Sequence, residues 1–335
     1  MKKLALAAAL TAAFAGSAFA QSSVTVYGRI NTSVEYQDNG KVTASGLKSN
    51  ASYWGLRGTE DLGDGLNAYF QLESGFDADN GGGSAGFSRD TYMGLKSASL
   101  GQIKLGKFTS ALYFGTIDFI GVFNHDSGTP AEDNIWALNS VVFNNGFEYT
   151  SPKLFGGLEF IATAVAGEKS GPDTYELAAN YDVDELHLSG GYSETKGRDV
   201  ANSKDVDKSG FALAASYVFG PLVAGISYDH VDVKGTDAYG KRDSVTATAM
   251  YTVDNSEFHL SVGHAGKWDN VADSSATQYT VGYNYNLSKR TKLFAFYYTV
   301  DNDAFPYGAS LNNSSLPVLS NEKFSSFGVG IRHNF

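Results

Sequence analysis

Two short strings in the sequence match motifs of hydrolases and nucleotide-binding proteins. Gly82-Gly83-Ser84-Ala85-Gly86 fits the G-x-S-x-G pattern of serine hydrolases, whose serine sits on a sharp turn between a strand and a helix. Here a glycine-rich connector surrounds Ser84, and no helical pattern follows it. Gly101 to Lys107 spells G-x-x-x-x-G-K, but Phe108 occupies the position of the Ser or Thr that binds Mg²⁺ in a P-loop. We therefore expect neither acyl transfer nor nucleotide binding.

The residues that could ligate a metal or exchange protons are not spaced for a site either. The chain has no Cys, which excludes thiolate nucleophiles and cysteine-based metal centres. His259 and His264 are five residues apart, so their side chains point to opposite faces of a strand. Carboxylates are plentiful, but the sequence alone places none of them in a catalytic pair. We expect a protein that is not an enzyme and that has no cofactor and no metal site.

The overall composition excludes further classes of protein. The 335 residues include 25 basic and 36 acidic ones, and the net charge of −11 argues against a nucleic-acid partner, because a phosphate backbone requires a basic face. The mean hydropathy of −0.21 excludes a bundle of transmembrane helices. It does not exclude a membrane β-barrel, in which apolar residues alternate with polar ones.

The first twenty residues have the pattern of a secretory signal peptide. Lys2 and Lys3 precede an apolar stretch from Leu4 to Ala15, and Ala18-Phe19-Ala20 forms an A-x-A cleavage site. We therefore predict a signal peptide at 1–20 and a single exported domain at 21–335.

The exported domain has a hydrophobic period of two residues. From Val24 to Tyr36 the even-numbered residues are mostly apolar, whereas the odd-numbered ones are polar or charged. Since successive side chains of a strand point to opposite faces, this strand separates an apolar surface from a polar one. The same alternation recurs from Leu66 to Phe76 and in the final residues up to Phe335. No segment shows a sustained helical period.

Sixteen such runs can be counted, joined by connectors that alternate between short and long. A soluble β-sandwich or a solenoid would also give many alternating strands. Export, the alternating connectors and aromatic residues near strand ends favour a membrane barrel, whose aromatic girdles lie at both membrane surfaces. The candidate girdle residues are Tyr27, Tyr36, Trp54, Phe76, Tyr149, Tyr297, Tyr298 and Phe335. We predict an all-β, 16-stranded antiparallel transmembrane β-barrel.

Several short segments, in the same order, resemble the trimeric general diffusion porins of Gram-negative outer membranes, particularly those of betaproteobacteria. The matching segments are Ser23 to Gly28, Trp54 to Gly63, Phe70 to Phe76, Tyr92 to Leu95, Leu105 to Lys107, Tyr149 to Pro152, Leu287 to Thr291 and Val329 to Phe335. Each segment is short, but together they extend over nearly the whole exported domain.

The resemblance implies a homotrimer in the outer membrane, in contact with lipids and lipopolysaccharide, with one water-filled pore per subunit. Ions and small hydrophilic solutes would diffuse through these pores. The third long loop, here Phe108 to Ser140, would fold inward and oppose basic residues of the barrel wall. Its acidic residues are Asp118, Asp126, Glu132 and Asp133. The terminal Phe335 is similar to the signal that barrel-assembly machinery reads in this family.

Alternation and the resemblance together give candidates for the wall of the constriction. Alternation places Arg29, Tyr53 and Arg57 on the lumenal face. The resemblance adds Arg89 and Lys107. Arg89 shares the strand parity of apolar residues that follow it, so it reaches the lumen only from a strand end or a bulge.

Two wall positions depart from the family pattern. Tyr53 stands where many relatives carry Arg, and Glu148 replaces a basic residue that is common just before Tyr149. Both changes make the lumen less positive, although relatives in this branch are often anion-selective. We predict a pore that is weakly selective or prefers cations.

Three other functions are compatible with the same barrel. A substrate-specific porin would carry a ladder of aromatic or basic residues through its lumen, and the sequence alone does not establish one. An outer-membrane enzyme would need a Ser–His or Asp–His set at one rim. An adhesive protein would use the barrel only to display loops such as residues 301–323.

Overall fold

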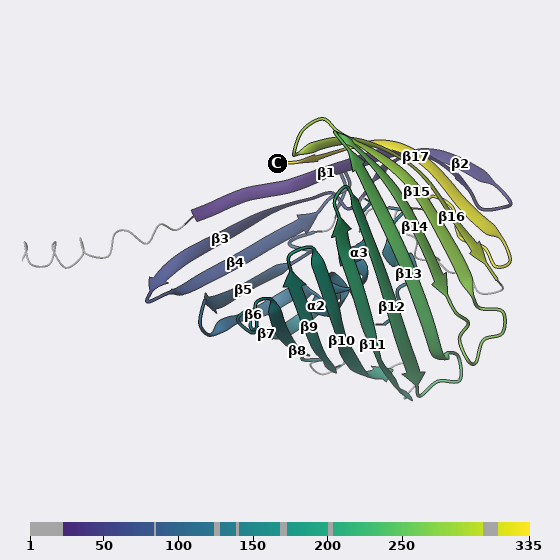
Figure 1. Ribbon diagram of the computed structural model, residues 1–335. Coiled ribbons are helices and arrows are strands. Elements are labelled where there is room, and N and C mark those ends of the chain that lie inside the picture. Colours follow the sequence, from purple (N-terminus) through teal and green to yellow (C-terminus); the bar gives the residue numbers. More distant parts are fainter. Residues whose placement is uncertain are drawn as a thin grey trace, which may run out of the picture.

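The computed structural model describes residues 23–83, 85–123, 128–138, 141–167, 173–199, 204–303 and 314–335. The predicted signal peptide lies outside the described residues and stays a prediction. Strands dominate the described part, with two short helices and one 3-10 turn between β6 and β7 (Figure 1). No helix in these ranges is long and apolar enough to cross a bilayer.

The elements have the following bounds. The first strands are β1 (Ser23–Asp38), β2 (Thr43–Ser49), β3 (Tyr53–Gly63), β4 (Leu66–Gly75), β5 (Thr91–Ser97) and β6 (Gly101–Thr109). Then come α2 (Ala111–Gly115), α3 (Ile117–Ile120) and the 3-10 turn η1 (Glu132–Ile135). The remaining strands are β7 (Val142–Thr150), β8 (Leu158–Val165), β9 (Asp173–Val183), β10 (Leu186–Asp199), β11 (Lys204–Phe219), β12 (Leu222–Lys234), β13 (Gly240–Val253), β14 (Ser256–Ala265), β15 (Ala276–Asn286), β16 (Thr291–Asn302) and β17 (Lys323–Asn334).

The antiparallel sheet closes on itself, because the first strand pairs with the last. β1 and β17 are in register from Arg29 opposite Asn334 to Asp38 opposite Ser325. The other edge of β1 pairs with β2 over one half and with β3 over the other half. β2 and β3 are thus one strand of the wall, interrupted at residues 50–52, where Ala51 has a φ of 50°. The wall has sixteen strands, and the predicted 16-stranded barrel is confirmed.

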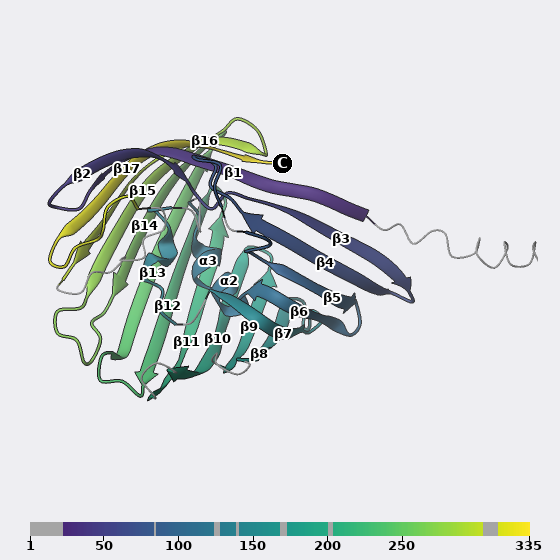
Figure 2. The same cartoon turned by 180° about the vertical axis from the view of Figure 1, so that it is seen from behind.

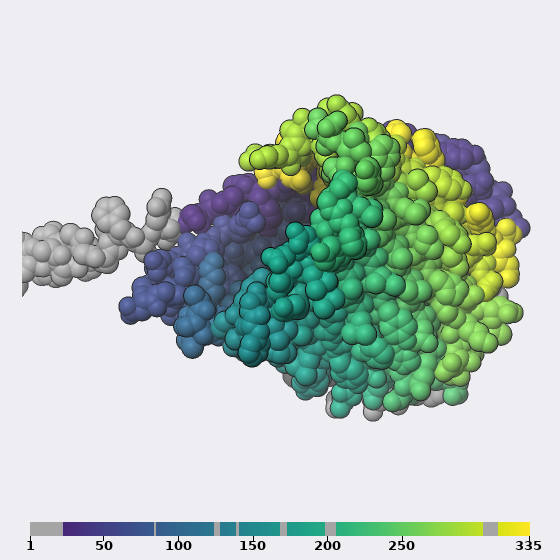
Figure 3. Space-filling model, in the orientation of Figure 1, coloured from purple at the N-terminus to yellow at the C-terminus, as the bar shows by residue number. Residues whose placement is uncertain are grey.

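The two faces of the wall differ as the alternation predicts. On β1 the side chains of Val34 and Tyr36 are 56% and 51% exposed on the outside, whereas Ser33, Glu35 and Gln37 are buried on the inside. This inverted pattern is typical of a barrel in lipid, because the outer surface meets hydrocarbon and the lumen holds water. The green and yellow strands form a continuous outer wall, and a hollow opens between them and the blue strands (Figure 3).

Two of the aromatic residues assigned to the girdles face the lumen instead. Tyr27 lies on the same face as Arg29, and its hydroxyl donates to Glu73 at 3.0 Å. Tyr298 is completely buried in an apolar cluster with Phe296 and Phe324. Position near a strand end was the wrong criterion for these two residues, because parity decides which side of the wall a side chain faces.

Tight turns join the strands at one end of the barrel. Val183 and Leu186 are connected by two residues, as are Val253 and Ser256. In both turns an aspartate, Asp184 or Asp254, has a φ near 50°, which suits the primed turns that match strand twist.

Candidate functional site

A long segment between β6 and β7 lies inside the barrel, against the inner face of β9 to β15 (Figure 2). We call residues 108–140 the inner loop, of which 108–123 and 128–138 are described. Its Ser110 hydroxyl donates to Glu176 of β9 at 2.7 Å, and Thr248 of β13 donates to the Ile120 carbonyl at 2.6 Å. Gln278 of β15 donates to the carbonyl of Glu132 at 3.2 Å. These bonds fasten the loop along its length.

Apolar side chains of the inner loop pack onto glycines of the wall. Five loop residues each lie over a lumenal glycine of a different strand, at a position where a β-carbon would come within 3.0 Å of the loop side chain. The pairs are Leu112 on Gly191, Leu138 on Gly210, Ile120 on Gly225, Ile135 on Gly263 and Phe123 on Gly282. The absence of side chains at these positions lets the loop lie close to the wall.

The first helix of the loop begins with an ordinary cap. The Ser110 hydroxyl accepts a hydrogen bond from the backbone N–H of Tyr113 at 3.1 Å, as expected for a serine at the N-cap. The backbone N–H of Leu112 donates to Glu176 at 3.0 Å. Local capping and the wall carboxylate therefore position α2 together.

The loop is also attached through His187 of β10. Its Nδ1 lies 2.6 Å from a carboxylate oxygen of Asp182, and its Nε2 lies 2.8 Å from the carbonyl oxygen of Gly115. The ring of Phe119 stacks on the imidazole with centroids 3.4 Å apart. Both partners of His187 are hydrogen-bond acceptors, so a protonated imidazole satisfies both contacts and a neutral one satisfies a single contact.

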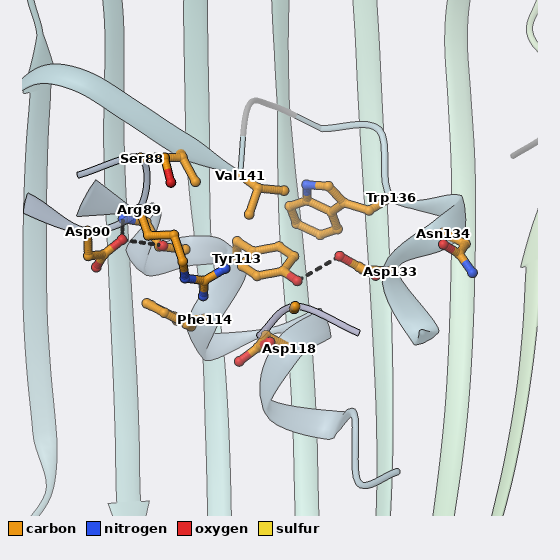
Figure 4. A pocket seen from close by; sticks show the side chains of 13 residues that line it. Ser88, Arg89, Asp90, Tyr113, Phe114, Asp118, Asp133, Asn134, Trp136 and Val141 are labelled. Carbon is orange, nitrogen blue, oxygen red and sulfur yellow. Dashed lines mark hydrogen bonds between the residues drawn. The ribbon is translucent and has the colours of Figure 1, made fainter. Parts of the chain in front are cut away.

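A cavity of about 530 Å³ separates the inner loop from the wall on the side of β5 and β6 (Figure 4). Arg89 and Asp90 line it from the wall, and Tyr113, Asp118 and Asp133 line it from the loop. The Tyr113 hydroxyl donates to Asp133 at 2.7 Å. In Figure 4 Arg89 extends toward the loop, so positive and negative groups lie on opposite sides of the cavity.

Burial changes the acidity of two carboxyl groups around this cavity. Burial raises the pKa of Asp90 above its ordinary value, although hydrogen bonds from Thr109 oppose the shift. Burial, with Asp133 and Asp118 nearby, raises the pKa of Glu132 well above its ordinary value. Glu132 is 2% exposed, so it lies behind the loop surface instead of facing the passage.

Of the four predicted loop acids, the structure thus brings Asp118 and Asp133 to the cavity. Glu132 is buried, and Asp126 lies outside the described residues. The sequence could not show which of these acidic side chains face the cavity, because their orientation depends on the conformation of the loop and not on strand parity.

The predicted wall residues Arg29, Tyr53 and Arg89 meet near the cavity. The guanidinium carbon of Arg29 lies 5.0 Å from the centroid of the Tyr53 ring, and that of Arg89 lies 4.8 Å from it. Arg89 also forms an ion pair with Glu73. Arg89 precedes β5, whose first residue is Thr91. Because Arg89 is not part of the strand, its side chain can face the lumen although its parity in the strand would point it outward.

Lys107 and Glu148 have different surroundings from those expected. Lys107 lies two positions after Leu105 on β6 and so shares its face of the strand, which is the outer face, where Leu105 is 51% exposed. The lumenal lysine of β6 is Lys104, whose Nζ lies 2.8 Å from Glu148. Thr163 donates to the same carboxylate at 3.3 Å. Glu148 is therefore a buried partner of Lys104.

Arg57 lies farther along the lumenal face of β3, with its guanidinium carbon 4.7 Å from the ring centroid of Tyr27. Several wall cations thus lie over tyrosine rings, an arrangement that the sequence alone did not predict. The signal was present in their shared parity, but the ring contacts join different strands and depend on register.

Comparison with known proteins places the chain among channels. Residues 5–304 match the family model described as Gram-negative porin. The chain is 30% identical to an outer membrane porin protein of Bordetella pertussis and 32% identical to outer membrane porin protein 32 of Delftia acidovorans, with both chains fully covered in each case. It is similar to the solved anion-selective porin from Comamonas acidovorans, with 28% identity, a TM-score of 0.81 and coverage of 94% of this chain and 100% of that one. OmpT of Vibrio cholerae in its trimer form shares the fold, with 16% identity, a TM-score of 0.75 and coverage of 94% and 99%.

Proposed function

Because this chain belongs to the Gram-negative porin family, whose members are outer-membrane channels and not enzymes, we propose that its lumen conducts ions and small hydrophilic solutes through a charged constriction. The protein belongs to the outer membrane of a Gram-negative bacterium. The observation that carries the proposal is the cavity between Arg89 on the wall and Asp118 and Asp133 on the inner loop.

The mechanism is passive diffusion along a hydrated path. Cations on one side and carboxylates on the other produce a field across the passage, since the low-dielectric wall does not screen them as bulk water does. An ion or a dipolar solute is oriented as it crosses this field. The hydrogen bonds from Ser110, Thr248 and Gln278 hold the loop side in place, which keeps the width and the field constant.

We propose that the pore is weakly selective or slightly prefers cations. Tyr53 takes the place of a cation, and Glu148 neutralises Lys104. Arg89 is likewise paired, with Glu73. The relative from Comamonas acidovorans is described as anion-selective, so a difference in charge pairing on the wall would distinguish the two proteins.

We further propose a homotrimer in contact with outer-membrane lipids and lipopolysaccharide. The solved trimer form of Vibrio cholerae OmpT, which shares the fold, supports this assembly, and the apolar outer face suits lipid and subunit contacts. Phe335 is the proposed assembly signal. Its backbone exchanges two hydrogen bonds with Gly28, at 3.0 and 3.1 Å, on the first strand.

Planar-bilayer recording of the purified protein under a tenfold KCl gradient tests these proposals. Large current steps that open or close in groups of three would support trimeric channels. A strong chloride preference in the reversal potential would contradict the proposed selectivity. A correctly folded protein without conductance would contradict the channel itself.

A further inference from the structure

One wall of the lumen is left open by the inner loop. The described part of the loop lies mainly against β9 to β16 and touches β1 where Thr129 donates to Glu35 at 3.3 Å. The passage therefore runs along the lumenal face of β3 to β6 and the adjoining half of β1, which we call the open wall. At one end of the open wall is the 530 Å³ cavity beside Arg89. A second cavity, of about 400 Å³, lies at its other end, among Asn67, Lys96 and Gln102 beside the tight turns. A solute that travels between the two cavities must pass along this wall.

A pair of tyrosine rings lies between two cations along the half of the open wall near the turns. The Nζ of Lys96 lies 5.8 Å from the ring centroid of Tyr69. That ring meets Tyr92 edge to face, with centroids 6.0 Å apart, and the Nζ of Lys104 lies 5.4 Å from the Tyr92 centroid. These distances are within the usual range of cation–π and aromatic contacts.

A second pair of tyrosine rings between cations lies nearer the constriction. Arg57 lies over Tyr27, and Tyr27 meets Tyr53 edge to face at 6.2 Å. Tyr53 in turn has Arg29 and Arg89 within 5.0 Å of its ring centroid. We call these five residues, together with Lys96, Tyr69, Tyr92 and Lys104, the cation–tyrosine track.

The hydroxyls of Tyr27, Tyr69 and Tyr92 are bonded to groups of the wall, so these tyrosines present their rings to the passage. The hydroxyl of Tyr92 donates to Gln71 at 3.1 Å, and that of Tyr69 donates to the carbonyl of Ile103 at 3.2 Å. Tyr69 also lies over Gly94, where a β-carbon would come within 2.6 Å of its ring. The rings are thus fastened against the wall and remain partly exposed.

Register sets the spacing of the track. Tyr69 pairs with Gly94, which pairs with Lys104, while the neighbouring lumenal row joins Gln71 to Tyr92. Successive lumenal positions on a strand are about 7 Å apart, which is close to the length of a small aromatic carboxylate. Arg57 and Lys96 lie on the lumenal face of their strands, over tyrosine rings, and neither forms an ion pair within the described part of the chain.

We propose that the cation–tyrosine track binds small aromatic carboxylates and guides them through the pore, an inference that rests on the channel function proposed above. A carboxylate pairs with a lysine or guanidinium group, and a planar ring stacks on tyrosine or on the flat face of arginine. A compound with only one of these features makes half of the contacts. The track therefore favours planar aromatic anions over aliphatic anions and over neutral aromatics of the same size.

Three probes of equal size separate these features in single-channel recording in KCl. Benzoate carries both the ring and the charge, cyclohexanecarboxylate carries the charge without the planar ring, and benzamide carries the ring without the charge. We expect benzoate to reduce the current in a saturable way at millimolar concentration. Equal effects of benzoate and cyclohexanecarboxylate, or of benzoate and benzamide, would overturn the proposal while leaving the conductance intact. Absence of any KCl current would instead overturn the channel function, and the track with it.

Variants assign the effect to the track. Tyr69→Leu should raise the apparent Kd for benzoate by about 3- to 10-fold, the loss expected for one aromatic contact, whereas Tyr69→Phe should stay within about twofold. Arg57→Gln should weaken benzoate and leave benzamide unchanged. Lys292→Gln, which removes a lumenal cation paired with Glu257 away from the track, is the matched control and should leave the benzoate Kd unchanged. A benzoate Kd that is the same in Tyr69→Leu and Arg57→Gln as in the native protein would refute the assignment.

Discussion

Glu148→Gln should convert the pore to one that prefers chloride. In the native protein Glu148 is buried on the lumenal face, 2.8 Å from Lys104, and the lysine charge is thereby cancelled. Glutamine retains the size and the hydrogen bond from Thr163 but leaves the ammonium group unpaired. The lumen gains one positive charge beside the open wall, where ions pass.

The size of the effect follows from Coulomb's law. A unit charge about 4 Å from an ion in water contributes ~1 kcal/mol, which is roughly a fivefold change in local ion concentration. Mobile ions screen the charge over about 10 Å at 0.1 M salt, which reduces this effect. We therefore expect a ratio of chloride to potassium permeability of about three in the Glu148→Gln pore. Under a tenfold KCl gradient, a threefold ratio moves the reversal potential by about 20 mV, compared with about 59 mV for a perfectly selective pore.

The assay is the reversal potential of single trimers. Lys104→Met should shift it toward potassium, and the double variant should return it to within a few millivolts of the native value. Glu194→Gln is the matched control, because Glu194 lies on the outer face near Lys196, at 3.7 Å, and not in the lumen. A Glu148→Gln pore with an unchanged potential, or one shifted toward potassium, would refute the idea that this carboxylate cancels the lysine charge.

Three other changes have defined outcomes. Asp118→Asn should also shift the reversal potential toward chloride, whereas Glu132→Gln should not, because Glu132 is buried. Since burial raises the pKa of Glu132 in the folded protein, the free energy of unfolding falls as the pH rises above the ordinary carboxyl range. Glu132→Gln should flatten that decline in thermal unfolding between pH 5 and 8. His187→Leu should show more loop closures than the native channel in single-channel records, because the variant loses the imidazole that joins the Asp182 carboxylate to the Gly115 carbonyl. Gly94→Ala should destabilise the barrel by about 1–3 kcal/mol in thermal unfolding, because the new methyl group would lie 2.2 Å from a backbone carbonyl oxygen and 2.6 Å from the Tyr69 ring; an unchanged transition would show that the wall can shift there.

The strand pattern could be predicted from the sequence because lipid and water impose opposite demands on the two faces of each strand. The run from Val24 to Tyr36 alternates in burial as its residue types suggest. The interruption between β2 and β3 was not predicted, because a bulge of one residue changes parity without a distinctive composition.

The site was less accessible to sequence reasoning. Parity placed Arg29 and Arg57 on the inner side, but it failed for Arg89, which precedes its strand, and the family position led to Lys107 where the lumenal residue is Lys104. The glycines that receive the inner loop and the contacts of the cation–tyrosine track join strands distant in sequence. Such contacts depend on register, which a single sequence does not specify.

The seam between β1 and β17 also determines the order in which the molecule can be built. Arg29 on β1 pairs with Asn334 on β17, so the first strand of the chain cannot complete its pairing until the last strand has been made. Until then both strands keep an unpaired edge, which is a template for pairing with other chains. Contacts so far apart in sequence also make folding slow. The wall is therefore free of unpaired edges only once β17 has paired with β1.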